Sequence, residues 1–190
     1  MRKYHWNNML TFKMHLISAW SDYFTGSPTI IQTQTAQTPS GTSVHVLNSL
    51  FRSITSSDRG AALLCTSVTY LLIESSSFFS CRTSYNYGGT ICFYNSGGQC
   101  VLHEVCGYDC CSTYTGGNAH DQFSYTNVKN DASSKNYVNY SSIIRCVNDN
   151  SNSYHTMRHY YGKQYYPSVN LSMNKCYGRV TYYYPYSDSN

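Results

Sequence analysis

The sequence predicts an all-β domain in which the chain forms a stack of about five coils of similar length. Three observations predict this fold class: a short motif that returns five times, a glycine-containing segment that recurs, and a composition that suits strands. Repeats of this length are typical of solenoids and other stacked architectures, in which each unit buries its apolar face against its neighbours.

The repeated motif reads Ser-apolar-x-x-Cys, with small residues at both ends. Its first residues lie 28, 29, 36 and 30 positions apart. The five copies are Ser49–Ser53, Ser77–Cys81, Cys106–Cys110, Ser142–Cys146 and Ser172–Cys176. Because the first copy ends in serine, the shared property of the last position is a small side chain. We therefore expect one column of small residues at an inner corner, formed by Ser53, Cys81, Cys110, Cys146 and Cys176.

A second landmark accompanies the first three copies. Gly60–Leu63, Gly88–Ile91 and Gly116–Ala119 each begin 28 residues after the one before. Two landmarks with the same order and spacing indicate one structural plan: an apolar strand, a small corner, a polar turn, a second small corner and another apolar strand.

The composition also favours strands. The chain has 21 tyrosines among its 190 residues, and only 12% of its residues are charged. Tyr, Thr, Val, Ile and Phe suit pleated surfaces, whereas runs of strong helix formers are absent. The strands expected in chain order are 44–47, 61–64, 68–73, 91–94, 101–102, 137–144 and 179–184.

Two regions are expected. Residues 1–42 form an irregular lead-in or cap that ends in a Thr/Gln/Pro-rich linker, with a helical stretch between Met9 and Phe24. Residues 43–190 form the solenoid domain, with a tyrosine-rich C-terminal end. Because a solenoid leaves a strand edge open at each end, these flanking segments are the natural covers.

The motifs resemble those of a known family. Gly60–Leu63 and Gly88–Ile91 resemble the GGA[ILV] repeat, and Phe78–Cys81 resembles the FxxN repeat, of right-handed parallel β-helix proteins of the polymorphic membrane protein type. Large Cys-rich protist surface proteins are similar in placing Cys at this corner. The resemblance covers residues 43–120 by these motifs, and residues 121–184 by the Ser-apolar-x-x-Cys motif alone. It implies a right-handed, pectin-lyase-like β-helix used for surface display and adhesion, without the corner amide ladder, since Cys81 replaces Asn.

The nine cysteines leave several arrangements open. The corner cysteines form either a column of buried thiols or strained disulfides between coils. Disulfides that join Cys106, Cys110 or Cys111 to Cys92 or Cys100 are a further arrangement. His103, Cys106, Cys110 and Cys111 could supply zinc ligands, but their spacing lacks paired CxxC motifs, and we expect neither a metal nor a cofactor.

An enzyme is the alternative interpretation, since polysaccharide lyases and hydrolases also use β-helices. Glycoside hydrolysis requires two carboxylates within about 5 to 9.5 Å of each other. Glu74 and Glu104, the chain's two glutamates, lie in corresponding parts of consecutive coils and are the candidate pair. The simpler interpretation is two solvated carboxylates on an outer face. A third alternative is a piece of a longer solenoid without a function of its own.

The tyrosines are the candidate binding residues for the favoured function, that of a non-enzymatic surface or secreted adhesion protein. Tyrosine combines a large apolar area with a polar tip and is enriched at recognition surfaces. The expected partners are glycans or another protein, and further solenoid coils could stack on the ends; the same tyrosines could instead cap the stack. The candidates are Tyr160, Tyr161, Tyr165, Tyr166, Tyr182, Tyr183 and Tyr184.

Charge and targeting signals limit the possible partners and the cellular location. The net charge is +4, but the basic residues are scattered, so we expect no nucleic-acid binding. No apolar stretch is long enough to span a membrane, and the first residues only partly match a signal peptide. The cysteine-rich, hydroxyl-rich composition predicts an extracellular or cell-surface protein, and Asn139 and Asn170 lie in glycosylation sequons.

Overall fold

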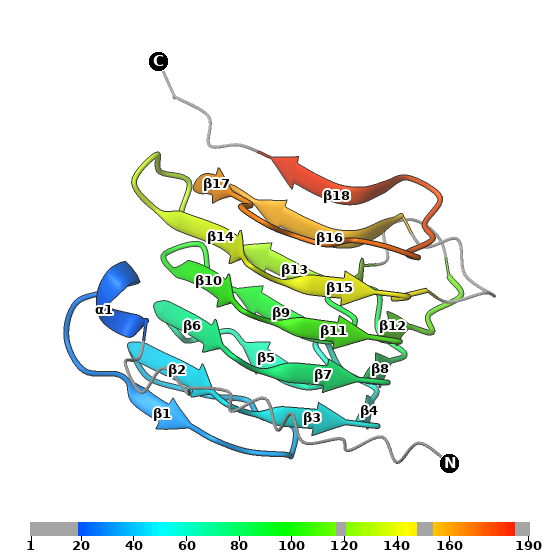
Figure 1. Cartoon of the computed structure of the whole chain (residues 1–190), viewed down its shortest axis with the longest axis horizontal. Helices are drawn as coiled ribbons and strands as arrows, with labels where there is room; N and C mark the ends of the chain where they lie inside the picture. Colours follow the sequence, from blue (N-terminus) through cyan, green and yellow to red (C-terminus); the bar gives the residue numbers. More distant parts are fainter. Residues whose placement is uncertain (1–18, 117–120, 148–153, 185–190) are drawn as a thin grey trace, which may run out of the picture.

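The computed structural model of the chain is a stack of short parallel strands (Figure 1). It describes residues 19–116, 121–147 and 154–184. Every strand pair among them is parallel, and the strands belong to four sheets. The predicted all-β class with parallel sheets is confirmed.

The largest sheet has six strands. In spatial order they are β1 (Thr29–Ile31), β2 (Ser43–Leu47), β6 (Tyr70–Glu74), β10 (Gln99–His103), β14 (Lys135–Asn139) and β17 (Lys163–Tyr165). The adjoining four-stranded sheet contains β3 (Leu50–Arg52), β7 (Ser77–Phe79), β11 (Cys106–Tyr108) and β15 (Ser142–Ile144).

Two more sheets complete the stack. The three-stranded sheet contains β4 (Thr55–Ser56), β8 (Arg82–Thr83) and β12 (Cys111–Ser112). The five-stranded sheet contains β5 (Leu63–Cys65), β9 (Ile91–Tyr94), β13 (Asp121–Asn127), β16 (His155–Tyr160) and β18 (Arg179–Tyr184). From β2 to β13 the chain enters the four sheets in a fixed order. We call one such round through the four sheets a passage, and each passage adds one strand to every sheet.

Single residues in left-handed backbone conformation make the bends between sheets. Asn48, Ser75, Glu104 and Tyr140 have φ between 46° and 54° and separate strands of the six-stranded sheet from those of the four-stranded sheet. Ser53, Ser80, Asp109 and Arg145 do the same at the far end of the four-stranded sheet. Non-glycine residues rarely adopt this conformation, so their recurrence shows that the fold imposes the same bend in each passage.

A buried serine follows the first bend in three passages. The Ser76 hydroxyl accepts the N–H of Ser49 at 3.1 Å and donates to the carbonyl of Glu74 at 2.8 Å. Ser141 repeats this arrangement, accepting the N–H of Val105 at 3.0 Å. These serines therefore pair backbone groups that the bend removes from the strand ladder.

The interior is filled by the inward side chains of all sheets. Phe51 and Phe78 stack with ring centroids 4.8 Å apart, and Phe123 meets Phe78 edge-on at 5.9 Å. Gly107 is the register partner of Phe78, and a Cβ there would clash with the Phe123 ring. The missing side chain at Gly107 thus gives Phe123 its place in the core.

The N-terminal region departs from the expectation of an irregular lead-in. β1 lies within residues 1–42 and pairs with β2, because Thr29, Ile30 and Ile31 are β-branched. The helix is confined to α1 (Trp20–Tyr23) among the described residues; most of the expected helical stretch lies outside them. No helix in the described part of the chain is long and apolar enough to cross a membrane.

Candidate functional site

The two glutamates occupy different environments. In the register of β6 and β10, Glu74 pairs with His103, so Glu104 lies one residue further along. The expectation that the two carboxylates are equivalent neighbours is therefore wrong by one position. Glu74 is the last residue of β6, whereas Glu104 is the left-handed residue of the following bend.

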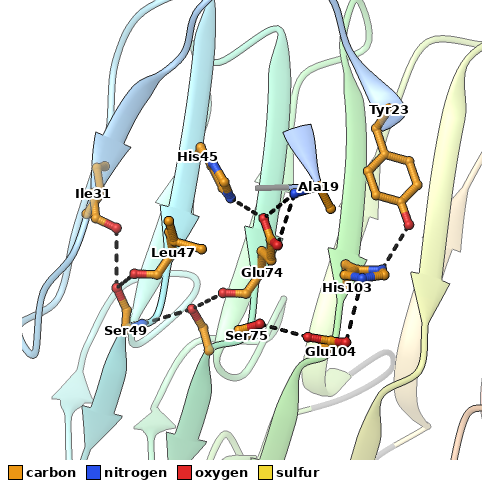
Figure 2. Close-up of polar contacts among 11 residues, drawn as sticks. Ala19, Tyr23, Ile31, His45, Leu47, Ser49, Glu74, Ser75, His103 and Glu104 are labelled. Carbon is orange, nitrogen blue, oxygen red and sulfur yellow. Dashed lines mark hydrogen bonds and ion pairs between the residues drawn. The ribbon is translucent and has the colours of Figure 1, made fainter. Parts of the chain in front are cut away.

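Glu74 lies on the outer side of its sheet but is only 7% exposed, because α1 covers it. One of its carboxylate oxygens lies 2.7 Å from His45 Nε2, and both accept the N–H of Ala19 at 3.1 Å (Figure 2). Burial lowers the pKa of His45, while the adjacent Glu74 carboxylate acts in the opposite direction. The carboxylate thus anchors the N-terminal end of α1.

Glu104, by contrast, faces solvent, with 56% of its side chain exposed. It accepts a hydrogen bond from Ser75 Oγ at 2.8 Å and lies 3.9 Å from His103 Nε2 (Figure 2). Neither glutamate lines the pocket described below. One carboxylate is closed in beneath α1 and the other lies in an open bend, so the two glutamates differ in burial and in hydrogen-bond partners.

A second contact of α1 involves Asn139, the asparagine of the first sequon. Asn139 Nδ2 donates to the Tyr23 hydroxyl at 2.7 Å, and that hydroxyl lies 2.9 Å from His103 Nδ1. Asn139 is only 3% exposed, and the amide nitrogen that would carry a glycan is the one that makes this bond. Asn170, in the second sequon, is exposed, and its Nδ2 donates to Ser142 Oγ at 3.3 Å.

The cysteine column exists, but its ends differ from the expectation. The register aligns Cys81, Cys110 and Cys146. The uninterrupted pairing of β3 and β4 with β7 and β8 places Ile54, not Ser53, beside Cys81. At the other end, the Ser142–Asn170 bridge places Asn174, not Cys176, beside Cys146, whose N–H it accepts at 2.8 Å.

No disulfide joins any two of the nine cysteines in the structure. Burial raises the pKa of Cys146 and Cys100, so these thiols stay protonated. His103 lies on the outer side of β10 and Cys110 lies in the core, so the two point away from a common centre. Within the described ranges, no three His, Cys, Asp or Glu side chains are grouped to hold a metal.

The seven candidate tyrosines separate into three groups. Tyr160, Tyr182 and Tyr184 lie on the outer side of the five-stranded sheet, where Tyr160 contacts both of the others. Tyr165 is exposed on the outer side of the six-stranded sheet beside Tyr137. Tyr161 and Tyr166 pack against the core, and Tyr183, the register partner of buried His159, lies on the same side of β18 as the core but is 57% exposed. These seven tyrosines therefore lie on more than one side of the strand stack.

The outer side of the five-stranded sheet carries further aromatic residues that are not among the seven candidates. Tyr125 contacts Tyr87 at 5.4 Å, Tyr94 at 6.0 Å and Tyr160 at 5.8 Å. The resulting strip of rings, which we call the tyrosine face, consists of Tyr85, Tyr87, Tyr94, Tyr125, Tyr160, Tyr182 and Tyr184.

A pocket of about 270 Å³ lies at one end of the tyrosine face. We call it the Arg59 pocket; its lining residues are Arg59, Tyr87, Cys92, Tyr94 and Tyr125. Cys92 is fully buried on the outer side of β9, between the core residues Ile91 and Phe93. Burial raises the pKa of the Cys92 thiol to about 12, so this group is neutral and a poor nucleophile.

The two arginines of the tyrosine face differ in their charge partners. Arg158 is buried and pairs with the buried Asp121 carboxylate at 2.8 Å. Arg59 is half-buried, with its guanidinium carbon 5.3 to 5.8 Å from the ring centroids of Tyr85, Tyr87 and Tyr94. No carboxylate of the described residues lies within 4.0 Å of it.

One sequence signal could have revealed this pocket. The N–H of Gly60 donates to the carbonyl of Gly88 at 2.7 Å, so these two glycines are neighbours across two passages of the chain. The residues just before them, Arg59 and Tyr87, are therefore adjacent as well. The 28-residue repeat already aligned these glycines, and extending it by one residue would have paired a cation with an aromatic ring.

Comparisons with known proteins add no relative: no protein-family model, curated protein or solved structure matches this chain.

Proposed function

We propose that this chain is a right-handed parallel β-helix that acts as a non-enzymatic surface or secreted interaction protein, and that it binds saccharides on the tyrosine face. The ordered passage through the sheets, with one parallel strand added to each, supports the architecture. The right-handed sense follows the strong preference of parallel crossover connections.

The observation that carries the proposal is the Arg59 pocket within a continuous aromatic strip. Tyrosine rings offer flat apolar faces to the C–H groups of a sugar, and their hydroxyl groups and the Arg59 guanidinium offer hydrogen bonds to its hydroxyl groups. Because the rings come from strands and tight turns of a packed sheet stack, they lose little conformational freedom when a ligand binds.

Binding without turnover fits the chemistry of this site. The Arg59 pocket contains no carboxylate among its lining residues, and its one thiol is neutral. The paired glutamates on which the hydrolase or lyase alternative rested are separated in register and burial. We therefore favour adhesion over catalysis, with the surface location kept as part of the proposal.

The proposal predicts that Tyr94→Ala weakens saccharide binding about tenfold, because a lost stacking contact costs on the order of 1 kcal/mol or slightly more. Tyr94 is 46% exposed at the pocket edge, so its removal leaves the core intact. The measurement is a glycan-array screen of the purified chain, followed by titration of the best ligand against the wild type and the variant.

Tyr108→Ala is the matched control. Tyr108 is 38% exposed on β11 and also has a guanidinium, that of Arg145, over its ring, but it lies on the four-stranded sheet. Its removal should leave the affinity unchanged. A folded wild-type chain that binds no saccharide, or equal losses in the two variants, would contradict the proposal, and release of sugar products would favour the enzyme alternative.

A further inference from the structure

Arg59 brings a positive charge into the pocket that the described residues do not neutralise. The neighbouring Asp58 carboxylate accepts the backbone N–H of Arg59 at 2.7 Å but makes no ion pair with its guanidinium within 4.0 Å. The Tyr85 hydroxyl holds the pKa of Arg59 above its usual range, so the guanidinium stays charged. In Arg158, the other arginine close to this site, the charge is matched by Asp121.

The pocket walls stabilise this charge without cancelling it. Three tyrosine rings lie within 5.8 Å of the Arg59 guanidinium carbon, an arrangement that attracts a cation through the ring quadrupole. Burial keeps the thiol of Cys92 and the hydroxyl of Tyr125 protonated, since it raises the pKa of both. The guanidinium has five N–H donors in one plane, a geometry that matches the two oxygens of a carboxylate or sulfate.

We infer that the saccharide bound in the Arg59 pocket carries a negative charge, as a carboxylate or a sulfate group on the sugar ring, and that Arg59 recognises it. This inference rests on the proposed saccharide-binding function and specifies its ligand class. The pocket volume of about 270 Å³ is near the lower end for ligand sites, which suits one ring of a glycan chain. The neighbouring rings of the tyrosine face lie where the next sugars of the chain would extend.

The test compares three sets of oligosaccharides that share a backbone: neutral, uronate-containing and sulfated. We expect the wild-type chain to bind at least one charged set about tenfold more tightly than the neutral set, with an affinity that falls as salt is added. The uronate and sulfate arms identify which group is recognised.

Arg59→Gln removes the charge and should abolish this preference, lowering affinity for the charged set about tenfold or more. Arg59→Lys keeps the charge but loses the planar pair of donors, so an intermediate affinity is expected. Arg145→Gln is the matched control, because Arg145 also lies over a tyrosine ring but outside the pocket, and it should bind like the wild type. Circular dichroism and thermal unfolding check that each variant is folded.

The outcomes separate the inference from the function on which it rests. Equal or tighter binding of neutral saccharides, with Arg59→Gln unchanged, would overturn the inference and leave saccharide binding in place. If no saccharide binds, both are overturned. A single-stranded oligonucleotide serves as a fourth ligand, and tighter binding of it than of every saccharide would overturn both in favour of a nucleic-acid partner.

Discussion

His159 is a fully buried histidine near the C-terminal end of the strand stack. Its Nε2 lies 3.1 Å from the Ser124 hydroxyl, and its Nδ1 lies 3.1 Å from the Tyr166 hydroxyl, which also donates to Gln164 at 2.6 Å. These partners satisfy a neutral imidazole but provide no negative charge for a protonated one. Burial accordingly lowers the pKa of His159 to about 3.

This residue should make folding stability depend on pH. Above its ordinary pKa of about 6.5, histidine is neutral in both folded and unfolded chains, so His159 adds no pH dependence. Below that value the unfolded chain binds a proton that the folded chain rejects, and stability falls as the pH falls toward 3. Between pH 7 and pH 5 this single group should lower the free energy of unfolding by about 2 kcal/mol.

Urea unfolding at pH 7 and pH 5 tests this prediction. His159→Gln keeps polar atoms in the site without the titration, so its loss of stability on acidification should be smaller than that of the wild type by this amount. Ile30→Ala, which removes an exposed side chain with no titratable group, is the control and should behave like the wild type. Burial also raises the pKa of Asp121, but Asp121 makes the same contribution to the pH dependence of stability in all three proteins, so its effect cancels in the comparison. Identical pH dependence in all three would refute the assignment.

At the same scale, the sequence predicted which residue types line the corner but not their register. The motif was defined by small residues, and Ser76 and Ser77 occupy two adjacent columns, one in the bend and one in the strand. An alignment of the repeats by their serines can therefore be wrong by one residue. The motif aligned Ser49 with Ser77, whereas the strand register pairs Leu50 with Ser77, and this error placed Ser53 in the cysteine column. The residue before each corner has a left-handed backbone conformation. Because this residue is Ser, Asp or Arg in different passages, no common residue type marks the position in the sequence.

Among the elements, α1 is held by its contacts rather than by its own helical tendency. It has only four residues, too few for independent stability, and lacks a side-chain cap. Trp20 and Phe24 pack with Leu72 and Val101 in a small apolar cluster on the outer side of the six-stranded sheet. Glu74 accepts the N–H of Ala19 beside this cluster.

Removing the central side chain of this cluster should release the element. We expect Trp20→Ala to lower the free energy of unfolding by about 2 to 4 kcal/mol, since it deletes a large buried ring and leaves Leu72 and Val101 partly uncovered. Limited proteolysis should then cut residues 19–28 faster than in the wild type. Ile30→Ala, which removes an exposed apolar side chain from β1, is the control and should change neither measurement appreciably. Unchanged proteolysis in Trp20→Ala would show that α1 is held mainly by its polar contacts.

The strands show where pattern reasoning succeeds and where it fails. β9 and β18 have the predicted bounds, because β9 is apolar or aromatic throughout and β18 is rich in β-branched residues and tyrosine. The segment 137–144, expected as one strand, is divided by the left-handed Tyr140 into β14 and β15. β13 and β16 were missed, because polar residues such as Ser124 and His159 face inward and remove the alternation on which a strand prediction depends.

Over the whole molecule, the interior changes character from the first passages of the chain to the last. Around β6 and β10 it holds Ile73, Phe78, Phe93 and Leu102, all fully buried. From β13 onward polar residues join the apolar ones in the interior, as the hydrogen bond of 2.8 Å between Thr126 and Asn136 illustrates. The repeat motif gave no sign of this gradient, because it describes the corners rather than the strand interiors. The tyrosine face spans both parts, with the Arg59 pocket at its apolar end.

The gradient predicts an order of local opening that amide hydrogen exchange can measure. Apolar burial gives the largest favourable contribution to stability, while hydrogen bonds between buried polar groups add little net free energy. β18 is also the edge strand of its sheet and is bonded on one side only among the described residues. We therefore expect amides of β6 and β10 to exchange slowest, at rates set by global unfolding, and amides of β17 and β18 to exchange at least tenfold faster through local opening.

Adding a saturating saccharide ligand should slow exchange in β9 and β13, which line the Arg59 pocket, before it slows exchange in β17. Uniform protection from β2 to β18 would instead show that the stack opens as one cooperative unit, with the polar end contributing as much stability as the apolar one.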